Sequence, residues 1–181
     1  MQLHVIVASA REGRAGRPIA EWFVERARAH GKFSIDLVDL KEVNLPLLDE
    51  PEHPRLQHYR HDYTKAWSAT VQRADAYVFV TPEYNHGAPP VLINALDCVF
   101  VEWNYKPAGF VSYGGVSAGT RSVVMTKTVL TGLKMVPILE AVNIPFFSKL
   151  MVDGVFNAGP AEDAAAVTML DELARWADAT P

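Results

Sequence analysis

Apolar runs of strand length alternate along this chain with segments of helical periodicity. The clear runs cover residues 3–8, 33–40, 76–81 and 108–112, and a less distinct run covers 141–147, where Pro145 marks a strand end or an edge position. Apolar residues at helical spacing mark residues 18–30, 64–73, 90–101, 119–133 and 161–177. Such alternation predicts an α/β domain with a parallel sheet.

The third and fourth runs, AYVFVT and AGFVS, are almost continuously apolar, which is typical of central parallel strands covered by helices on both faces. The second run, FSIDLVDL, alternates and predicts an edge strand. A length of 181 residues with 49% apolar and 21% charged residues predicts one folded domain over residues 1–181. Residues 41–63 form a long loop without clear periodicity, and loops of this length inside a compact domain are more often functional than idle.

Several classes of protein are disfavoured by the sequence. Its longest apolar stretches, such as 76–80 and 89–93, are far shorter than the roughly 20 residues that a membrane helix needs. A net charge of −4 argues against a general nucleic-acid surface. The start of the chain lacks the features of a secretory signal, and the lone Cys98 lies in an apolar run that predicts a buried, inert thiol. We therefore expect a cytoplasmic protein with neither nucleic-acid nor membrane partners.

In an open parallel sheet, ligands bind beyond the carboxyl ends of the strands, so the loops that leave the strands are searched first. The first loop places Ser9, Arg11, Arg14, Gly16 and Arg17 close together before a helix. A hydroxyl, guanidinium groups and the amides of a helix N-terminus can jointly hold a phosphate. A solvated turn whose arginines only favour solubility is the alternative. The loop has neither a G-x-G-x-x-G pattern nor a P-loop.

The second loop, TPEYNHGAPPVLINALD, directly follows the most apolar run. Gly87 can adopt backbone conformations closed to other residues, and Pro89 and Pro90 then mark the start of a helix. Such a turn presents backbone amides and carbonyls to the polar edge of a flat heteroaromatic ring, with Tyr84 as an amphipathic surface beside it. An ordinary strand-to-helix connection is the alternative reading.

The third loop, SYGGVSAGTRS over residues 112–122, contains three glycines and enters another helix. Small residues allow the backbone to approach a ligand closely. A glycine-rich helix entry is weak evidence alone, but this is the third such loop on the predicted sheet.

Taken together, the segments SAREGRAGRPIAEW, TPEYNHGAPPVLINALD and KPAGFVSYGGVSAGTR resemble the NADPH-dependent FMN reductase family of flavodoxin-like folds. The resemblance covers most of residues 1–133, is weaker beyond them, and is most specific in TPEYNHG. It implies a three-layer sandwich with a five-stranded parallel sheet of order 2-1-3-4-5, helices on both faces and FMN at the carboxyl edge. It also implies a homodimer or homotetramer, and ping-pong hydride transfer from NAD(P)H through FMN to free flavin, a quinone, an azo compound or a metal oxyanion.

Carried over by position, the resemblance assigns FMN binding to residues of all three loops. These are Ser9, Arg11, Arg17, Pro18 and Ile19 in the first loop, Pro82, Glu83, Tyr84 and Asn85 in the second, and Ser112, Gly114, Gly115, Val116 and Ser117 in the third. Ser9, Arg11 and Arg17 are assigned to the phosphate region. Gly16 and Pro18 stand where many relatives have a serine and an asparagine, and we expect Arg17 to compensate.

The flavin carries the redox chemistry, so we expect no catalytic acid–base residue from the chain itself. Glu83 is expected to fix its turn or to contact a partner chain. His86 either donates a proton to the reduced acceptor or caps the turn. His53, His58 and His61 offer no plausible ligand set, so no metal site is expected.

Two other functions remain open from the residues alone. One is a flavodoxin-type FMN electron carrier that does not itself oxidise a nicotinamide, which the arginine-bearing first loop and the modest charge disfavour. The other is a nucleotide-binding module without redox activity, because fold alone does not decide function.

One segment is more apolar around its circumference than packing on a single sheet requires, through Val91, Leu92, Ile93, Leu96, Val99, Phe100, Val101 and Trp103. This predicts at least a homodimer that covers the segment. A helix wholly buried within one chain is the alternative.

Overall fold

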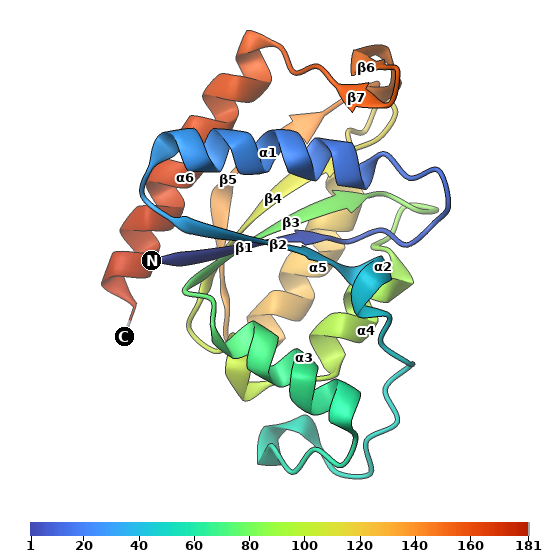
Figure 1. Ribbon diagram of the computed structural model, residues 1–181, viewed down its shortest axis with the longest axis vertical. Helices are drawn as coiled ribbons and strands as arrows, with labels where there is room; N and C mark the ends of the chain where they lie inside the picture. The colour runs from blue at the N-terminus through green and yellow to red at the C-terminus, as the bar shows by residue number, and fades with distance from the viewer. Residues whose placement is uncertain (181) are drawn as a thin grey trace.

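The strands form one parallel sheet at the centre of the computed structural model, which describes residues 1–180 (Figure 1). Pro181, the last residue of the predicted domain, lies outside the described residues. The strands are β1 (Gln2–Val7), β2 (Ser34–Asp39), β3 (Ala76–Pro82), β4 (Pro107–Tyr113) and β5 (Val136–Ile144). Their order is β2-β1-β3-β4-β5, with every neighbouring pair parallel. The predicted fold class, the strand order and the edge position of β2 are confirmed.

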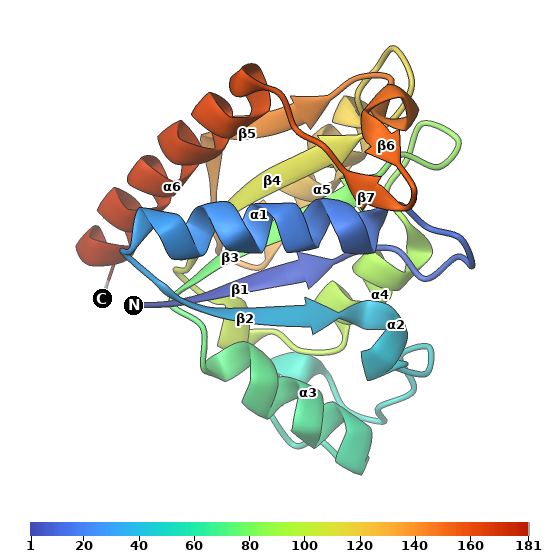
Figure 2. The ribbon, with the colours of Figure 1, turned by 45° about the horizontal axis from the view of Figure 1, so that its top comes forward.

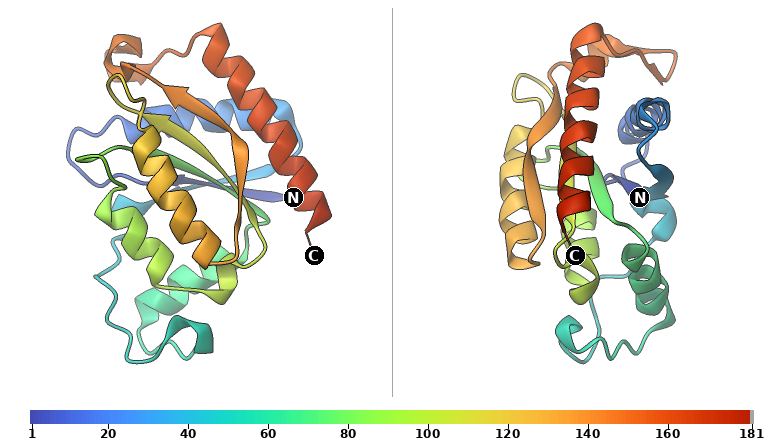
Figure 3. Two further views of the ribbon diagram at one scale, coloured as in Figure 1. Left: turned by 180° about the vertical axis from the view of Figure 1, so that it is seen from behind. Right: turned by 90° about the vertical axis from the view of Figure 1, so that its left-hand side faces the viewer.

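Helices cover both faces of the sheet, which makes the three-layer sandwich (Figure 3). They are α1 (Gly16–His30), α2 (Leu40–Val43), α3 (Asp62–Gln72), α4 (Pro90–Asp97), α5 (Thr120–Gly132) and α6 (Pro160–Ala179), with short 3-10 helices η1 (Pro54–Leu56), η2 (Val101–Trp103) and η3 (Phe147–Leu150). The first and last α-helices pack on one face, and α3, α4 and α5 pack on the other. None of the helices in the described part of the chain is long and apolar enough to span a membrane.

Every residue of β3 and β4 is buried, as their continuous apolar runs predicted. Side chains of a strand alternate between the two faces, so Val78 and Val80 join the core under α1 and α6. Tyr77 and Phe79 join the opposite core, where the Tyr77 ring lies 4.8 Å from that of Trp103. Two separate cores therefore hold the central strands in place and fix where their carboxyl ends emerge.

The fifth strand differs most from the sequence prediction. It begins at Val136 rather than at residue 141, and it ends at Ile144, directly before Pro145. Pro137 lies inside the strand, where an edge position tolerates a residue that has no backbone donor. A small hairpin of β6 (Met151–Val152) and β7 (Val155–Phe156), which the sequence did not predict, follows η3.

The apolar segment expected to need a partner packs largely inside its own chain. Leu92, Leu96, Val99 and Trp103 are fully buried in the core under α4. The helix also stops at Asp97 instead of residue 101, and the rest of the segment turns through η2. The buried-helix alternative therefore accounts for these four side chains.

The long loop between β2 and α3 is packed against the domain, with α2 and η1 inside it. The buried carboxylate of Glu102 holds its end, because it accepts hydrogen bonds from the Tyr59 hydroxyl at 3.0 Å and the Gln57 amide at 3.1 Å. The Ser68 hydroxyl, on α3, donates to the same carboxylate at 2.6 Å. This end of the loop is therefore tied to the part of the domain that lies below α3 in Figure 1.

Candidate active site

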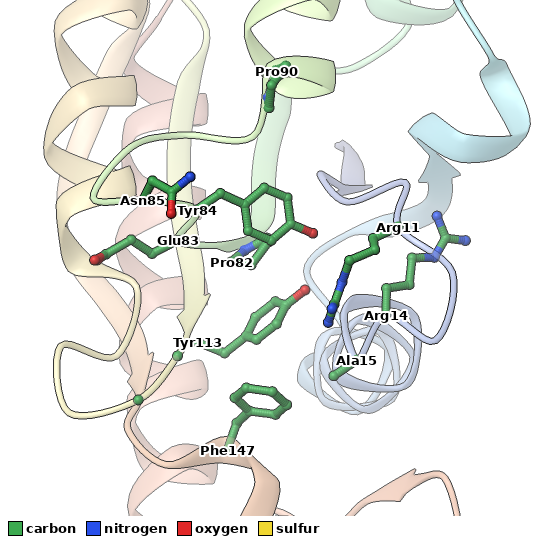
Figure 4. Close-up of a pocket in the computed structure, with 12 residues that line it drawn as sticks. Arg11, Arg14, Ala15, Pro82, Glu83, Tyr84, Asn85, Pro90, Tyr113 and Phe147 are labelled. Atoms are coloured by element: carbon green, nitrogen blue, oxygen red, sulfur yellow. The ribbon is translucent and has the colours of Figure 1, made fainter.

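The strand arrowheads point to one edge of the sheet, where the three loops identified from the sequence gather (Figure 2). They surround a cleft of about 660 Å³, a volume in the range of cofactor sites. The residues that line it are Arg11, Arg14, Ala15, Pro82, Glu83, Tyr84, Asn85, Pro90, Tyr113, Gly114, Gly115 and Phe147 (Figure 4).

The three arginines of the first loop have different surroundings. Arg14 donates to the backbone oxygen of Ser9 and to the carboxylate of Asp39, both at 2.5 Å, and the Asp39 side chain is fully buried at the end of β2. Arg17 pairs with Glu21 at 2.8 Å, Glu42 at 2.9 Å and the same Asp39 at 3.2 Å.

Within residues 1–180, Arg11 forms no ion pair. Figure 4 shows its guanidinium group turned toward Tyr113, whereas that of Arg14 turns away from the cleft. The first loop therefore offers one uncommitted guanidinium group to an anion in the cleft.

The amino end of α1 faces the same cleft. Its N-cap residue, Ala15, lines the cleft and has a methyl side chain, which cannot accept a hydrogen bond from the first-turn amides. A Cβ at Gly16 would overlap the Ser9 hydroxyl and would lie 2.7 Å from the Tyr113 hydroxyl. Only glycine therefore lets α1 begin this close to β1 and β4.

The second loop closes as a tight turn. The backbone groups of Tyr84 and Gly87 exchange two hydrogen bonds, at 3.0 and 2.9 Å, around Asn85 and His86. Gly87, which could have adopted the unusual backbone conformation expected in this turn, does not have a positive φ; instead φ is 50° at Asn85 and 67° at His86. Two central residues with positive φ are the geometry of a type I′ turn, for which asparagine is well suited and histidine less so.

Glu83 joins the second loop to the third. Its carboxylate accepts hydrogen bonds from the Arg121 guanidinium group at 2.7 Å, the Arg121 backbone amide at 3.2 Å and the Ser117 hydroxyl at 3.2 Å. Burial alone raises the pKa of Glu83, but these donors outweigh it and hold the pKa below its ordinary value. The ionised carboxylate therefore fastens the start of α5 to the end of β3.

Two aromatic residues form the side of the cleft near β4 and β5. Tyr113 is buried at the end of β4, and its ring lies 5.2 Å from that of Phe147 in an edge-to-face arrangement. Burial raises the pKa of the Tyr113 phenol, so its hydroxyl stays protonated near neutral pH. This hydroxyl lies 3.5 Å from the Ser9 hydroxyl and links the first and third loops.

Seven of the fourteen predicted FMN-binding residues line the cleft: Arg11, Pro82, Glu83, Tyr84, Asn85, Gly114 and Gly115. The others lie around it or away from it. Ser9 and Ser117 contact cleft residues, whereas Ser112 donates to Asn143 at 2.9 Å and Val116 is exposed. Ile19 is buried in the core below α1, Pro18 lines a separate pocket beside α1, and Arg17 pairs with Glu21, Asp39 and Glu42.

Five residues that line the cleft are not among the fourteen assigned to FMN: Arg14, which the first loop had offered as one of several arginines near a phosphate, and Ala15, Pro90, Tyr113 and Phe147. Tyr113 stands between two predicted residues, so its place at a strand end was the available signal. Phe147 comes from a segment beyond the family resemblance, and no local pattern marked it.

The histidines of the long loop face carboxylates one at a time. His58 lies 3.0 Å from Glu52, and His61 lies 3.8 Å from Asp49. Among residues 1–180 no group of three or more histidine, cysteine or acidic side chains is placed to hold a metal ion.

The cleft suits FMN on its own chemistry. An uncapped helix start and a free guanidinium group at one end match a phosphate. Tyr84 and the backbone of the second and third loops provide aromatic surface and polar groups for a flat heteroaromatic ring, and the Tyr113 hydroxyl lies beside the start of α1.

A family model described as NADPH-dependent FMN reductase matches residues 1–149. The chain belongs to the NADPH-dependent FMN reductase family. It is 40% identical over 145 residues to an NAD(P)H-dependent FMN reductase of Schizosaccharomyces pombe, covering 78% of this chain and 72% of the relative. It is 36% identical over 147 residues to another of Saccharomyces cerevisiae, covering 75% and 76%.

The family membership confirms the predicted enzyme class, an oxidoreductase with FMN as cofactor and NAD(P)H as co-substrate. Among solved structures, the fold is similar to the flavoenzyme NAD(P)H:acceptor oxidoreductase FerB of Paracoccus denitrificans, with a TM-score of 0.78 and 19% identity, covering 98% of this chain and 97% of that one. It is also similar to the apo form of an NADH:FMN oxidoreductase, with a TM-score of 0.69 and 15% identity, covering 96% and 88%. At these identities the structural likeness supports the fold.

Proposed function

We propose that this reductase holds one FMN in the cleft and passes electrons from NAD(P)H to a small aromatic acceptor such as a quinone, an azo compound or free flavin. The observation that carries the proposal is a cleft in which the Arg11 guanidinium group and the amino end of α1 can bind a phosphate, while Tyr84 and the backbone of the second and third loops can hold a flat aromatic ring. Relatives named 2-hydroxy-1,4-benzoquinone reductase and FMN-dependent NADPH-azoreductase support this class of acceptor.

The chain's own residues bind FMN and orient it. Arg11 and the amino end of α1 hold the phosphate. Pro82, Tyr84, Asn85, Gly114 and Gly115 contact the ring, and Ser9, Glu83 and Ser117 support the loops that carry these residues. The bound flavin accepts hydride and releases electrons, which is chemistry that no side chain has to supply.

Donor and acceptor share one face of the bound flavin in this proposal, because the three loops surround one flavin-sized cleft. The two substrates therefore bind in turn, and double-reciprocal plots should be parallel. No proton-transferring side chain is required, and His86 serves the turn.

The test combines binding and turnover. Titration of the flavin-free protein with FMN should saturate at about one FMN per chain, and stopped-flow absorbance should show the bound flavin bleached by NADH or NADPH and reoxidised by a quinone or azo dye. A protein that binds no FMN would overturn the proposal. Binding without bleaching would instead indicate an electron carrier, and intersecting plots would contradict a shared face.

We also propose a homodimer that covers the outer face of α4 and α5. Val124 and Met125 are exposed on α5, and the Met125 sulfur accepts a hydrogen bond from the Ala88 amide beside the second loop. An apolar surface next to a cleft loop suits an interface between two copies. Light scattering should give a dimer at micromolar concentration and a monomer for Val124→Lys; a monomeric wild type would refute the interface.

A cytoplasmic location completes the proposal. NAD(P)H is drawn from the cell's interior, and the chain's single cysteine, Cys98, is buried and free, as suits a reducing compartment. Fractionation of cells that express the tagged chain tests the location.

A further inference from the structure

Phe146 is an exposed aromatic residue in a strained backbone conformation beside the cleft. Its φ and ψ are 47° and 40°, and 47% of the residue is exposed. Large side chains rarely adopt this left-handed conformation, which asparagine or glycine adopts at lower cost. Neither core packing nor turn geometry therefore explains a phenylalanine at this position.

The neighbours of Phe146 belong to the cleft. Its backbone amide donates to the oxygen of Gly115 at 3.1 Å, and the amide of Phe147 donates to the oxygen of Gly114 at 3.3 Å. Gly114, Gly115 and Phe147 all line the cleft. The segment after β5 is therefore fastened to the third loop, and Phe146 stands at the rim of the site that receives the substrates.

A cation accompanies the aromatic ring. The Lys149 ammonium group lies 5.1 Å from the centre of the Phe146 ring, and the Lys149 amide donates to the Phe146 oxygen at 2.9 Å. Asp153 follows Lys149 by four residues, but within residues 1–180 no ion pair joins Lys149 to a carboxylate. The ammonium group lies over one face of the exposed ring, and such a ring is suited to stack its other face on a purine base that carries a phosphate nearby.

We propose that Phe146 and Lys149 bind the adenosine end of NAD(P)H, an inference that rests on the proposed function. The nicotinamide has to reach the flavin inside the cleft, so the rest of the dinucleotide must extend over the rim. The adenine stacks on the Phe146 ring, and Lys149 attracts the 2′-phosphate that distinguishes NADPH from NADH. The pair thereby sets both the affinity for the donor and its preference for NADPH.

The test compares donors with and without the adenosine. The FMN-loaded enzyme is assayed with NADPH, NADH and reduced nicotinamide mononucleotide, which has no adenosine. Phe146→Asn removes the ring and keeps a residue that tolerates the backbone conformation. It should lower kcat/KM for NADPH and NADH by about fivefold to twentyfold and leave the mononucleotide and the FMN dissociation constant unchanged. Lys149→Met should lower kcat/KM for NADPH about threefold to fivefold more than for NADH.

The chain offers a matched control at the opposite edge of the sheet. Tyr105 also has a positive φ, 64°, is 52% exposed, and has the Lys134 ammonium group 5.7 Å from its ring centre. It precedes β4 and lies far from the cleft, so Tyr105→Asn should leave all three donors unaffected.

Each outcome decides a separate point. Equal losses with all three donors, or no loss with NADH after Phe146→Asn, would overturn the stacking role. Equal losses with NADH and NADPH after Lys149→Met would overturn the 2′-phosphate role. A wild-type protein that oxidises none of the donors would refute the proposed function itself, whereas wild-type oxidation with unresponsive variants would refute this inference alone.

Discussion

The carboxylate of Glu83 and the guanidinium group of Arg121 lie 2.7 Å apart and join two loops that come from different strands. Glu83 follows β3, and Arg121 is in the first turn of α5, beyond the third loop. The Glu83 side chain is 9% exposed, so the contact is shielded from solvent on one side. The spacing between the two walls of the cleft therefore depends on the Glu83 carboxylate, through this ion pair and its hydrogen bonds to the Arg121 amide and the Ser117 hydroxyl.

We predict that Glu83→Gln weakens FMN binding about threefold to tenfold, because a neutral amide holds Arg121 and Ser117 less firmly. Arg121→Gln should have a similar effect. The double variant should lose no more FMN affinity than either single variant, because the effects of two residues that act as a pair are not additive. Fluorescence titration of FMN measures all three. Fully additive losses would show that the two side chains act independently.

The pair of Glu83 and Arg121 should also make FMN affinity depend on pH. The pKa of Glu83 is held below its ordinary value of 4.5, so its ionised form stabilises the folded site above that value, and this contribution is lost as pH falls through the lowered pKa. FMN affinity of the wild type should therefore decline more steeply in acid than that of Glu83→Gln. Parallel acid profiles of the two proteins would contradict this assignment.

The two adjacent glycines of the third loop should respond differently to substitution. A Cβ at Gly114 would lie 2.9 Å from the Gly119 amide nitrogen, so Gly114→Ala should destabilise the fold by about 1–3 kcal/mol. A Cβ at Gly115 meets nothing within 4 Å in the described structure and points to a site that FMN would occupy.

Gly115→Ala should therefore leave the thermal midpoint of the flavin-free protein unchanged and weaken FMN by on the order of tenfold. Thermal unfolding and FMN titration of both variants separate the two roles. Unaltered FMN affinity in Gly115→Ala would place the ring elsewhere in the cleft.

Much of this fold could be predicted because the decisive signals are local. The continuous apolar character of β3 is visible in six residues, and it fixed the position of the polar TPEYN segment at a sheet edge. Likewise, the alternation of β2 predicted its edge position. The specific TPEYNHG segment predicted the family, and with it the strand order that no local pattern contains.

The remaining features depend on contacts between distant parts of the chain. Nothing near Arg14 in the sequence predicts that its guanidinium group pairs with Asp39, 25 residues later. Phe147 reaches the cleft only because β5 ends beside β4. The turn after β3 has positive φ at Asn85 and His86. The backbone pairing of Tyr84 with Gly87 determines this turn type, and the conformational freedom of Gly87 does not.

Lys106, which lies far from the cleft, should make the free energy of unfolding increase at alkaline pH. Burial lowers the pKa of Lys106 to about 8 from its ordinary 10.5, and its ammonium group donates to the backbone oxygens of Val71 and Gln72 at 3.2 and 3.0 Å. Between these two pKa values the unfolded chain binds more protons than the folded one, so this group's contribution to stability increases with pH.

Lys106→Met removes that titration and keeps the length of the side chain. We expect the free energy of unfolding of the wild type, measured relative to Lys106→Met in urea, to increase from pH 8 to pH 10. A constant difference between the two proteins would show that burial does not perturb this amine.

Replacing Arg14 and replacing Arg17 should have different effects on stability and FMN affinity, although both side chains pair with Asp39. Arg14→Ala removes the 2.5 Å partner of a fully buried carboxylate and releases the first loop. It should cost about 1–3 kcal/mol of stability and weaken FMN and riboflavin alike. Arg17→Ala removes contacts of a more exposed side chain, so it should cost at most about 1 kcal/mol and leave FMN affinity unchanged. A specific loss of FMN in Arg17→Ala would restore its predicted role at the phosphate.

Arg11 is the arginine that should recognise the phosphate itself. Its guanidinium group is not committed to a carboxylate within residues 1–180, lines the cleft, and shares that end with the uncapped start of α1. Arg11→Ala should weaken FMN by roughly ten- to a hundredfold, equivalent to about 1.5–3 kcal/mol, because a charge-assisted contact is lost. Riboflavin lacks the phosphate, so its affinity should stay the same, and Arg17→Ala is the matched control on the same loop. Paired titrations of both flavins decide the matter: equal losses for FMN and riboflavin would mean that Arg11 supports the ring or the fold, and the phosphate would have to lie at another part of the cleft.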